Sequence, residues 1–141
     1  ELLMIQLTDE MQDLLNNSLL NGTPCILTTA SPSGDLTIGF RGSMMAWESD
    51  SLAYWERGKG QSLEHLEGGG NAAVILRNPE LRKGWKFFGK GTVLRDGPVR
   101  QSIMGKVVKP EMDRDPEGEG FAVILKLDRV EDLGGRPIMS N

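Results

Sequence analysis

A short glycine-bracketed loop carries the residue types that bind phosphate. It reads Gly58-Lys59-Gly60-Gln61-Ser62 and leads into a segment with helical spacing over residues 61–67. Backbone N–H groups, an ammonium and a hydroxyl at the start of a helix together suit an anionic phosphate. Gln61 and Ser62 also fit an ordinary helix cap, so the loop alone leaves both interpretations open.

A strand-like segment before this loop offers a second set of polar groups. Alternation places Gly39, Arg41 and Ser43 on one face and Ile38, Phe40 and Met44 on the other. Arg41 and Ser43 then lie about 7 Å apart. Gly39 and Gly42 weaken a strand and indicate a bend or a close approach by a ligand. We hypothesise that a phosphorylated planar cofactor lies along these strands, although Arg41 could pair with a surface carboxylate and Ser43 could be solvated.

The composition excludes several classes of function. The 141 residues carry a net charge of −4 with scattered basic residues, which argues against a nucleic-acid or anionic-membrane surface. No apolar run approaches the roughly 20 residues that span a bilayer. The single cysteine, Cys25, lies in an apolar run and is interpreted as a small buried hydrophobe in a reducing cytoplasm.

The single histidine, His65, limits metal and hydrolytic chemistry. One His and one Cys cannot build a zinc site, and no motif supports His65 in a hydrolase triad. A haem-binding barrel would need the same His65 as its axial ligand. On the expected helix 61–67 we predict a surface position for it.

The remaining pattern predicts a single domain over residues 1–141, mainly β, with two or three short helices. The predicted helices are 9–20, 61–67 and 99–108. The predicted strands are 24–30, 36–47, 52–57, 72–76, 85–94 and 121–127. Residues 109–120 are expected to form an exposed, mobile loop, and the tail after 127 is expected to be mostly irregular. Six strands with short connections favour a closed or split antiparallel barrel.

Several short segments of the sequence, taken in their order along the chain, resemble the pyridoxamine 5'-phosphate oxidase-like family, and most closely its small flavin-binding members. They are C-I-L-T-T, S-G-D-L-T-I-G-F-R-G-S, L-A-Y-W-E-R, G-Q-S-L-E-H-L and W-K-F-F-G-K-G-T-V-L-R-D-G-P. The resemblance covers about residues 20–130. It implies a six-stranded Greek-key split barrel that forms a homodimer, with FMN in the grooves between the protomers.

The resemblance also implies which residues contact the cofactor. One strand, along the ribityl chain and ring, contributes Gly39, Phe40, Arg41, Gly42, Ser43 and Met44. The strand at the ring edge is Tyr54–Arg57, with Trp55, Glu56 and Arg57 as its candidate contacts, and the family's phosphate positions correspond to Gln61 and Ser62. Gln61 departs from the family pattern because it replaces a basic residue, so Lys59 or Arg57 would have to compensate. Trp55 and Trp85 are candidate flavin contacts, with core or dimer-interface packing as the alternative.

These residues favour an FMN-dependent oxidoreductase acting on an unidentified small molecule by hydride or electron transfer. Substrate would enter near the Glu80–Gly84 loop, and no catalytic acid or base is identified. The tryptophan and arginine that true oxidases carry near the C-terminus are absent from residues 121–141, which argues against vitamin B6 oxidation. The alternatives are a non-enzymatic flavin or electron-transfer module, a barrel for a deazaflavin or pyridoxal phosphate, and a barrel without cofactor.

Overall fold

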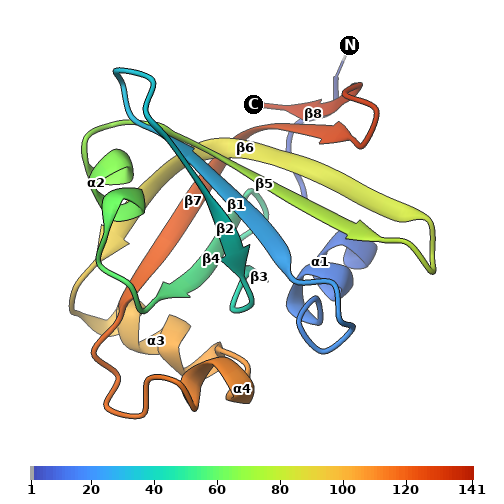
Figure 1. Ribbon diagram of the computed structural model, residues 1–141. Coiled ribbons are helices and arrows are strands. Elements are labelled where there is room, and N and C mark those ends of the chain that lie inside the picture. The colour runs from blue at the N-terminus through green and yellow to red at the C-terminus, as the bar shows by residue number, and fades with distance from the viewer. Residues whose placement is uncertain (1) are drawn as a thin grey trace.

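A single curled antiparallel sheet forms the centre of the molecule (Figure 1). The computed structural model describes residues 2–141. The strands are β1 (Cys25–Ala30), β2 (Leu36–Arg41), β3 (Met45–Ala46), β4 (Ser51–Glu56), β5 (Asn71–Asn78), β6 (Lys83–Leu94), β7 (Phe121–Asp132) and β8 (Pro137–Ser140). Their order is β2-β1-β5-β6-β7-β4-β3, and β8 pairs with β7. The predicted split antiparallel barrel is therefore confirmed.

Four short helices lie around this sheet: α1 (Asp9–Asn16), α2 (Gln61–Glu67), α3 (Pro98–Lys106) and α4 (Lys109–Met112). Figure 1 shows α2 beside one flank of the sheet and α3 and α4 together at one end, near the start of β7. The chain termini lie at the other end, where Leu3 bridges Met139. Within residues 2–141, no helix has the length and apolar character needed to cross a membrane.

The prediction of six strands was wrong by two short strands. The expected strand 36–47 is interrupted at Gly42 and Ser43, where the Met44 N–H donates to the Arg41 carbonyl in a turn, so that β2 and β3 are separate. The tail was expected to be irregular, but β8 pairs with Arg129–Glu131 of β7. Such a short strand carries too few residues to show a clear alternation in sequence.

Two helical segments also differ from the prediction. The expected helix 9–20 ends at Asn16, because the next residue, Asn17, caps it with bonds from its N–H to the Asp13 and Leu15 carbonyls. Residues 109–120, expected as one exposed loop, contain α4 and are anchored to β4 by a partly buried hydrogen bond. There the Trp55 indole N–H donates to an Asp115 carboxylate oxygen at 2.7 Å.

The hydrophobic core is divided into two clusters by β4, all of whose residues are buried. Tyr54 and Leu52 face the larger cluster inside the barrel, together with Phe87, Leu27 and Leu15. Ala53 and Trp55 face the smaller cluster, which α3 covers with Ile103. Because the side chains of a strand alternate between its faces, β4 separates two different environments.

Candidate cofactor site

An ion pair between Arg41 and Glu56 forms the polar centre of the candidate site. Arg41 is the last residue of β2 and Glu56 the last of β4, and the Arg41 Nη2 lies 3.0 Å from the Glu56 Oε2. The side chains are 22% and 8% exposed. Burial raises the pKa of the Glu56 carboxyl above its ordinary value, and the Arg41 guanidinium opposes that rise. The sequence left open that Arg41 pairs with a surface carboxylate. Arg41 does pair with a carboxylate, but this carboxylate is the buried Glu56 of the candidate site.

Gly39 leaves the space into which the Arg41 side chain folds. A Cβ atom at Gly39 would lie 3.1 Å from the Arg41 Nη1, so the two residues share a face as the strand alternation predicts. The same Nη1 donates to the Phe40 carbonyl at 2.8 Å. The guanidinium is thus held along the end of β2 instead of extending into solvent.

Two buried hydroxyl groups beside this ion pair have no hydrogen-bond partner in the described part of the chain. They are the phenol of Tyr54 and the Oγ of Ser62, the second residue of α2. Burial raises the pKa of the Tyr54 phenol, with Glu56 adding to the rise, while Arg41 and the nearby Ser62 hydroxyl act in the opposite direction. A buried hydroxyl without a partner loses the hydrogen bonds it made in water, so such a group calls for a further partner such as an ordered water or a ligand oxygen.

The loop from Arg57 to Gln61 supplies exposed cations next to Ser62. The ammonium of Lys59 lies 4.5 Å from the centre of the Phe121 ring, and the Arg95 guanidinium lies 5.0 Å from the same ring. Arg95 is paired with Glu67, whereas Lys59 forms no ion pair with any of residues 2–141. Gln61, which replaces a cation in the family pattern, therefore has an unpaired lysine two residues before it.

The Arg41–Glu56 pair borders a shallow hollow of about 130 Å³, whereas Tyr54, Lys59 and Ser62 are not among its lining residues. Its lining residues are Phe40, Arg41, Trp55, Glu56, Arg57, Gly58 and Glu111. Five of the predicted cofactor residues therefore meet at one place. Ligand pockets usually enclose about 300–1,000 Å³, so this hollow is smaller than a typical ligand pocket.

Ser43 and Trp55 have structural contacts that the sequence did not indicate. The Ser43 Oγ donates to the Trp55 carbonyl and accepts from the Trp55 N–H at 2.9 Å. Ser43 is buried, so the interpretation as a solvated strand serine was wrong. Its side chain replaces the backbone pairing that β3 and β4 lose at the Gly42–Ser43 turn. Met44 is likewise buried in the larger cluster.

Trp85 and the Glu80–Gly84 loop lie away from the hollow within one copy of the chain. Trp85 pairs with Leu76 and Asp132, whereas Leu94, at the other end of β6, pairs with Ala122 beside Phe121. Nine residues of extended strand separate Trp85 from Leu94, a distance of about 30 Å. Trp85 instead packs at the edge of the larger cluster.

His65 is buried, so the predicted surface position was wrong. Its ring is 6% exposed, and its Nδ1 lies 2.9 Å from the Thr29 Oγ1, which in turn contacts the Thr37 hydroxyl. Leu63, His65 and Leu66 lie on the buried side of α2. The position of His65 between two leucines of this helix is the signal in the sequence that could have indicated its burial. Cys25 is buried as predicted, and burial raises the pKa of its thiol to about 11.

The comparisons with known proteins identify the fold. No protein-family model and no curated protein sequence matches the chain. Among solved structures, HupZ from Group A Streptococcus superposes with a TM-score of 0.72 at 21% identity, covering 95% of this chain and 98% of that one. A pyridoxamine 5'-phosphate oxidase-related, FMN-binding protein from Nostoc punctiforme gives a TM-score of 0.63 at 15% identity, with coverages of 87% and 81%. An F420 reductase gives 0.55 at 16%, with coverages of 82% and 94%.

At these identities the likeness concerns the fold. The chain shares its split-barrel fold with these structures, as the sequence resemblance implied for the fold.

Proposed function

We propose that the chain binds FMN between two copies of itself and uses it as the redox cofactor of an oxidoreductase. The observation that carries the proposal is the pair of neighbouring buried hydroxyls, Tyr54 and Ser62, which have no partner other than each other and lie next to the Arg41–Glu56 ion pair. Ser62 is one of the two positions at which the sequence resemblance expects the phosphate. The residues present therefore fit the cofactor.

Each group has a separate role in this proposal. Ser62 donates its hydroxyl to the phosphate, and the unpaired Lys59 supplies the charge that Gln61 lacks. Arg41, held by Glu56, stabilises the negative charge that reduction places on the flavin. The isoalloxazine ring of FMN supplies the hydride or electron chemistry, and the protein provides binding and electrostatics.

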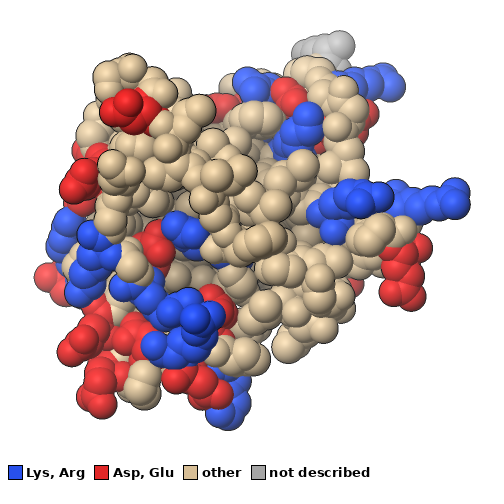
Figure 2. All heavy atoms as spheres, viewed as in Figure 1, with Lys and Arg blue, Asp and Glu red and all other residues tan. Residues whose placement is uncertain are grey.

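The second copy is proposed from a row of exposed apolar side chains on β2. Leu36, Ile38 and Phe40 are 70%, 78% and 67% exposed and follow one another on the outward face of this edge strand. Figure 2 shows a broad uncharged surface over the region of β1 and β2, bordered by charged residues. Phe40 also lines the hollow, so a copy that covers the row would add the missing wall of the cofactor pocket.

The visible spectrum of the freshly purified protein, with mass spectrometry of whatever heat releases, tests the cofactor. Flavin absorbance and the mass of FMN are expected. Ser62→Ala combined with Lys59→Gln should weaken FMN binding by about tenfold or more, since a charge-assisted hydrogen bond is removed. Lys90→Gln is the matched control, because Lys90 lies outside the Gly58–Ser62 loop and its ammonium bonds to the Gly69 carbonyl. A colourless protein that ignores added FMN contradicts the proposal.

A deazaflavin is the second candidate cofactor. Two observations favour this candidate: the fold is similar to that of an F420 reductase, and Gln61 stands where the family pattern has a basic residue. Competition between FMN and F420 for the same protein decides between them. Turnover with a panel of small oxidants and reductants separates an enzyme from an electron-transfer module.

The buried Cys25 thiol, with its raised pKa, fits the proposed reducing cytoplasm.

A further inference from the structure

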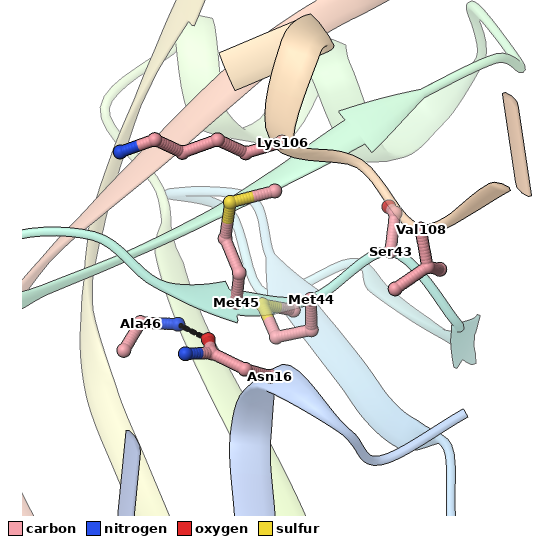
Figure 3. Close-up of a pocket in the computed structure, with 7 residues that line it drawn as sticks. All are labelled: Asn16, Ser43, Met44, Met45, Ala46, Lys106 and Val108. Atoms are coloured by element: carbon pink, nitrogen blue, oxygen red, sulfur yellow. Dashed lines mark hydrogen bonds between the residues drawn. The ribbon is translucent and has the colours of Figure 1, made fainter. Parts of the chain in front are cut away.

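A second hollow lies between the end of α1, the segment around β3 and the end of α3, and it shares Ser43 and Met44 with the residues expected along the flavin. It encloses about 250 Å³. The lining residues are Asn16, Ser43, Met44, Met45, Ala46, Lys106 and Val108. Figure 3 shows Lys106 and Asn16 on opposite walls with the Met45 side chain between them.

The hollow has one unpaired cation. Lys106 is the last residue of α3, and it forms no ion pair with any of residues 2–141. Its ammonium lies 4.9 Å from the centre of the Trp47 ring, which holds the charge near the hollow. None of the seven lining residues is acidic. The charge of Lys106 is therefore available to an anion.

Asn16 supplies an oriented amide on the facing wall. Its Oδ1 accepts from the Ala46 N–H at 2.9 Å, so the end of α1 is tied to β3. This bond fixes which side of the amide faces Ala46 and leaves the two N–H groups of Nδ2 as donors. Met44, Met45 and Val108 complete the lining with apolar groups, and methionine thioethers adapt to a variety of ligand shapes.

We propose that this hollow binds a small carboxylate with an apolar body, with Lys106 and Asn16 as its anchors. A single cation and a single amide match a monoanion, whereas a phosphate dianion calls for more positive charge. The thioether and valine groups suit a branched or aromatic body.

The role of this ligand rests on the proposed function: the carboxylate is the substrate of the proposed oxidoreductase. Ser43 and Met44 line this hollow and also belong to the strand expected along the flavin, while Glu111, three residues after Val108, lines the Arg41 hollow. The two sites therefore adjoin across α4.

Methyl NMR of the full chain labelled at methionine methyl groups tests the site without depending on FMN. Benzoate is the probe, and Met45→Leu identifies the Met45 resonance. Saturable shifts of the Met44 and Met45 methyl signals are expected, with about millimolar affinity for a ligand of this size. Lys106→Gln should weaken binding about tenfold, because it removes the charged partner.

Two control variants and two control ligands make the result specific. Lys109→Gln changes an exposed lysine that is already paired with Asp113, and it should leave benzoate affinity within about twofold. Val108→Asp places a carboxylate in the hollow at the N-cap of α4, where Asp is well tolerated, and should abolish binding. Benzamide and phenyl phosphate should each bind about tenfold more weakly than benzoate.

The proposal is overturned if benzoate leaves the Met44 and Met45 signals unmoved, if Lys106→Gln binds benzoate as well as the unmodified chain, or if phenyl phosphate binds as tightly as benzoate. A separate FMN titration of the same sample distinguishes failure of this site from failure of the cofactor proposal.

Discussion

The two faces of β4 differ in whether their buried indole and hydroxyl groups have hydrogen-bond partners. On the outer face, the Trp55 indole N–H donates to Asp115, which also accepts the N–H groups of Glu119 and Gly120. Arg100 lies 4.8 Å from the centre of the Trp55 ring and donates from its Nη2 to the carbonyls of Gly118 and Gly120, while its Nε is buried without a partner in the described part of the chain. On the inner face and its end, Tyr54 and Ser62 keep hydroxyls without partners beside the Arg41–Glu56 pair.

This difference separates groups that hold the fold from groups that are prepared for a ligand. Hydrogen bonds made within the chain stabilise the folded state, whereas buried polar groups without partners lower its stability until something binds. Substitutions on the outer face should therefore reduce stability, and those on the inner face should chiefly reduce cofactor affinity. The following changes test that division, from the largest expected effect to the smallest.

Gly120→Ala should have the largest effect on stability. A Cβ atom there would lie 2.6 Å from the Trp55 Nε1 and 2.8 Å from the Glu56 carbonyl oxygen, so the loop must move away from β4. We expect a loss of about 3 kcal/mol in the free energy of unfolding, measured in urea. Gly105→Ala in α3 is the control, because nothing lies within 4 Å of the added atom and the helix gains propensity. Equal behaviour of the two variants would contradict the packing described at Trp55.

Asp115→Ala should follow, with a loss of about 2 kcal/mol at pH 7, because it removes the acceptor of the Trp55 indole and of two backbone N–H groups. Burial acts to raise the pKa of Asp115, but these donors together lower it below its ordinary value of 3.8.

The sign of its pH dependence follows from the lowered pKa. The contribution of Asp115 is present above pH about 4 and is lost as pH falls through the lower pKa of the folded state. The difference between Asp115→Ala and the unmodified chain should therefore shrink between pH 5 and 3. Asp113→Ala, which removes only an exposed pair with Lys109, should cost about 0.5 kcal/mol. A difference for Asp115→Ala that grows in acid contradicts this assignment.

Arg41→Gln should cost about 1.5 kcal/mol at pH 7, because it leaves the Glu56 carboxylate buried without its cation. The pKa of Glu56 is already raised by burial and should rise further. A raised pKa in the folded state means that stability is present at low pH and is lost as pH rises, so the cost should disappear toward pH 4. Arg41→Gln with Glu56→Gln should recover most of the stability. Failure of the double variant to recover any of it would show that Arg41 acts through packing alone.

Ser62→Ala should leave the stability of the cofactor-free chain unchanged or raise it by up to about 1 kcal/mol, because the lost hydroxyl has no partner. Thr29→Val is the comparison on a partnered buried hydroxyl, and it should lose about 1 kcal/mol since Thr29 bonds to His65. Urea unfolding of both variants checks the difference. A larger loss for Ser62→Ala than for Thr29→Val would mean that Ser62 supports the fold.

More of the fold than of the candidate site could be predicted from the sequence. Alternation and turn residues located the long strands, because each has enough residues to show its period. β3 and β8 are too short for that, and the break before β3 depends on a side-chain bond from Ser43 to Trp55 that no local pattern encodes.

Within the site, the sequence placed Arg41, Glu56 and Ser62 near one another through the ordered resemblance. It placed Tyr54 on the strand at the ring edge without singling out its hydroxyl, and it missed Glu111, which reaches Gly42 only through the fold of α4. The position of His65 was missed for the same reason. Contacts between residues distant in the chain set its burial, and its own neighbours do not.

Equilibrium titration of FMN against the cofactor-free protein, followed by quenching of the flavin fluorescence and paired with light scattering, tests the central claim most directly. The unmodified chain should be a dimer that binds one FMN per chain. Ile38→Asp, which charges the exposed row on β2, should be a folded monomer that binds FMN at least tenfold more weakly. No binding by the dimer, or equally tight binding by the monomer, contradicts a cofactor pocket shared between two copies.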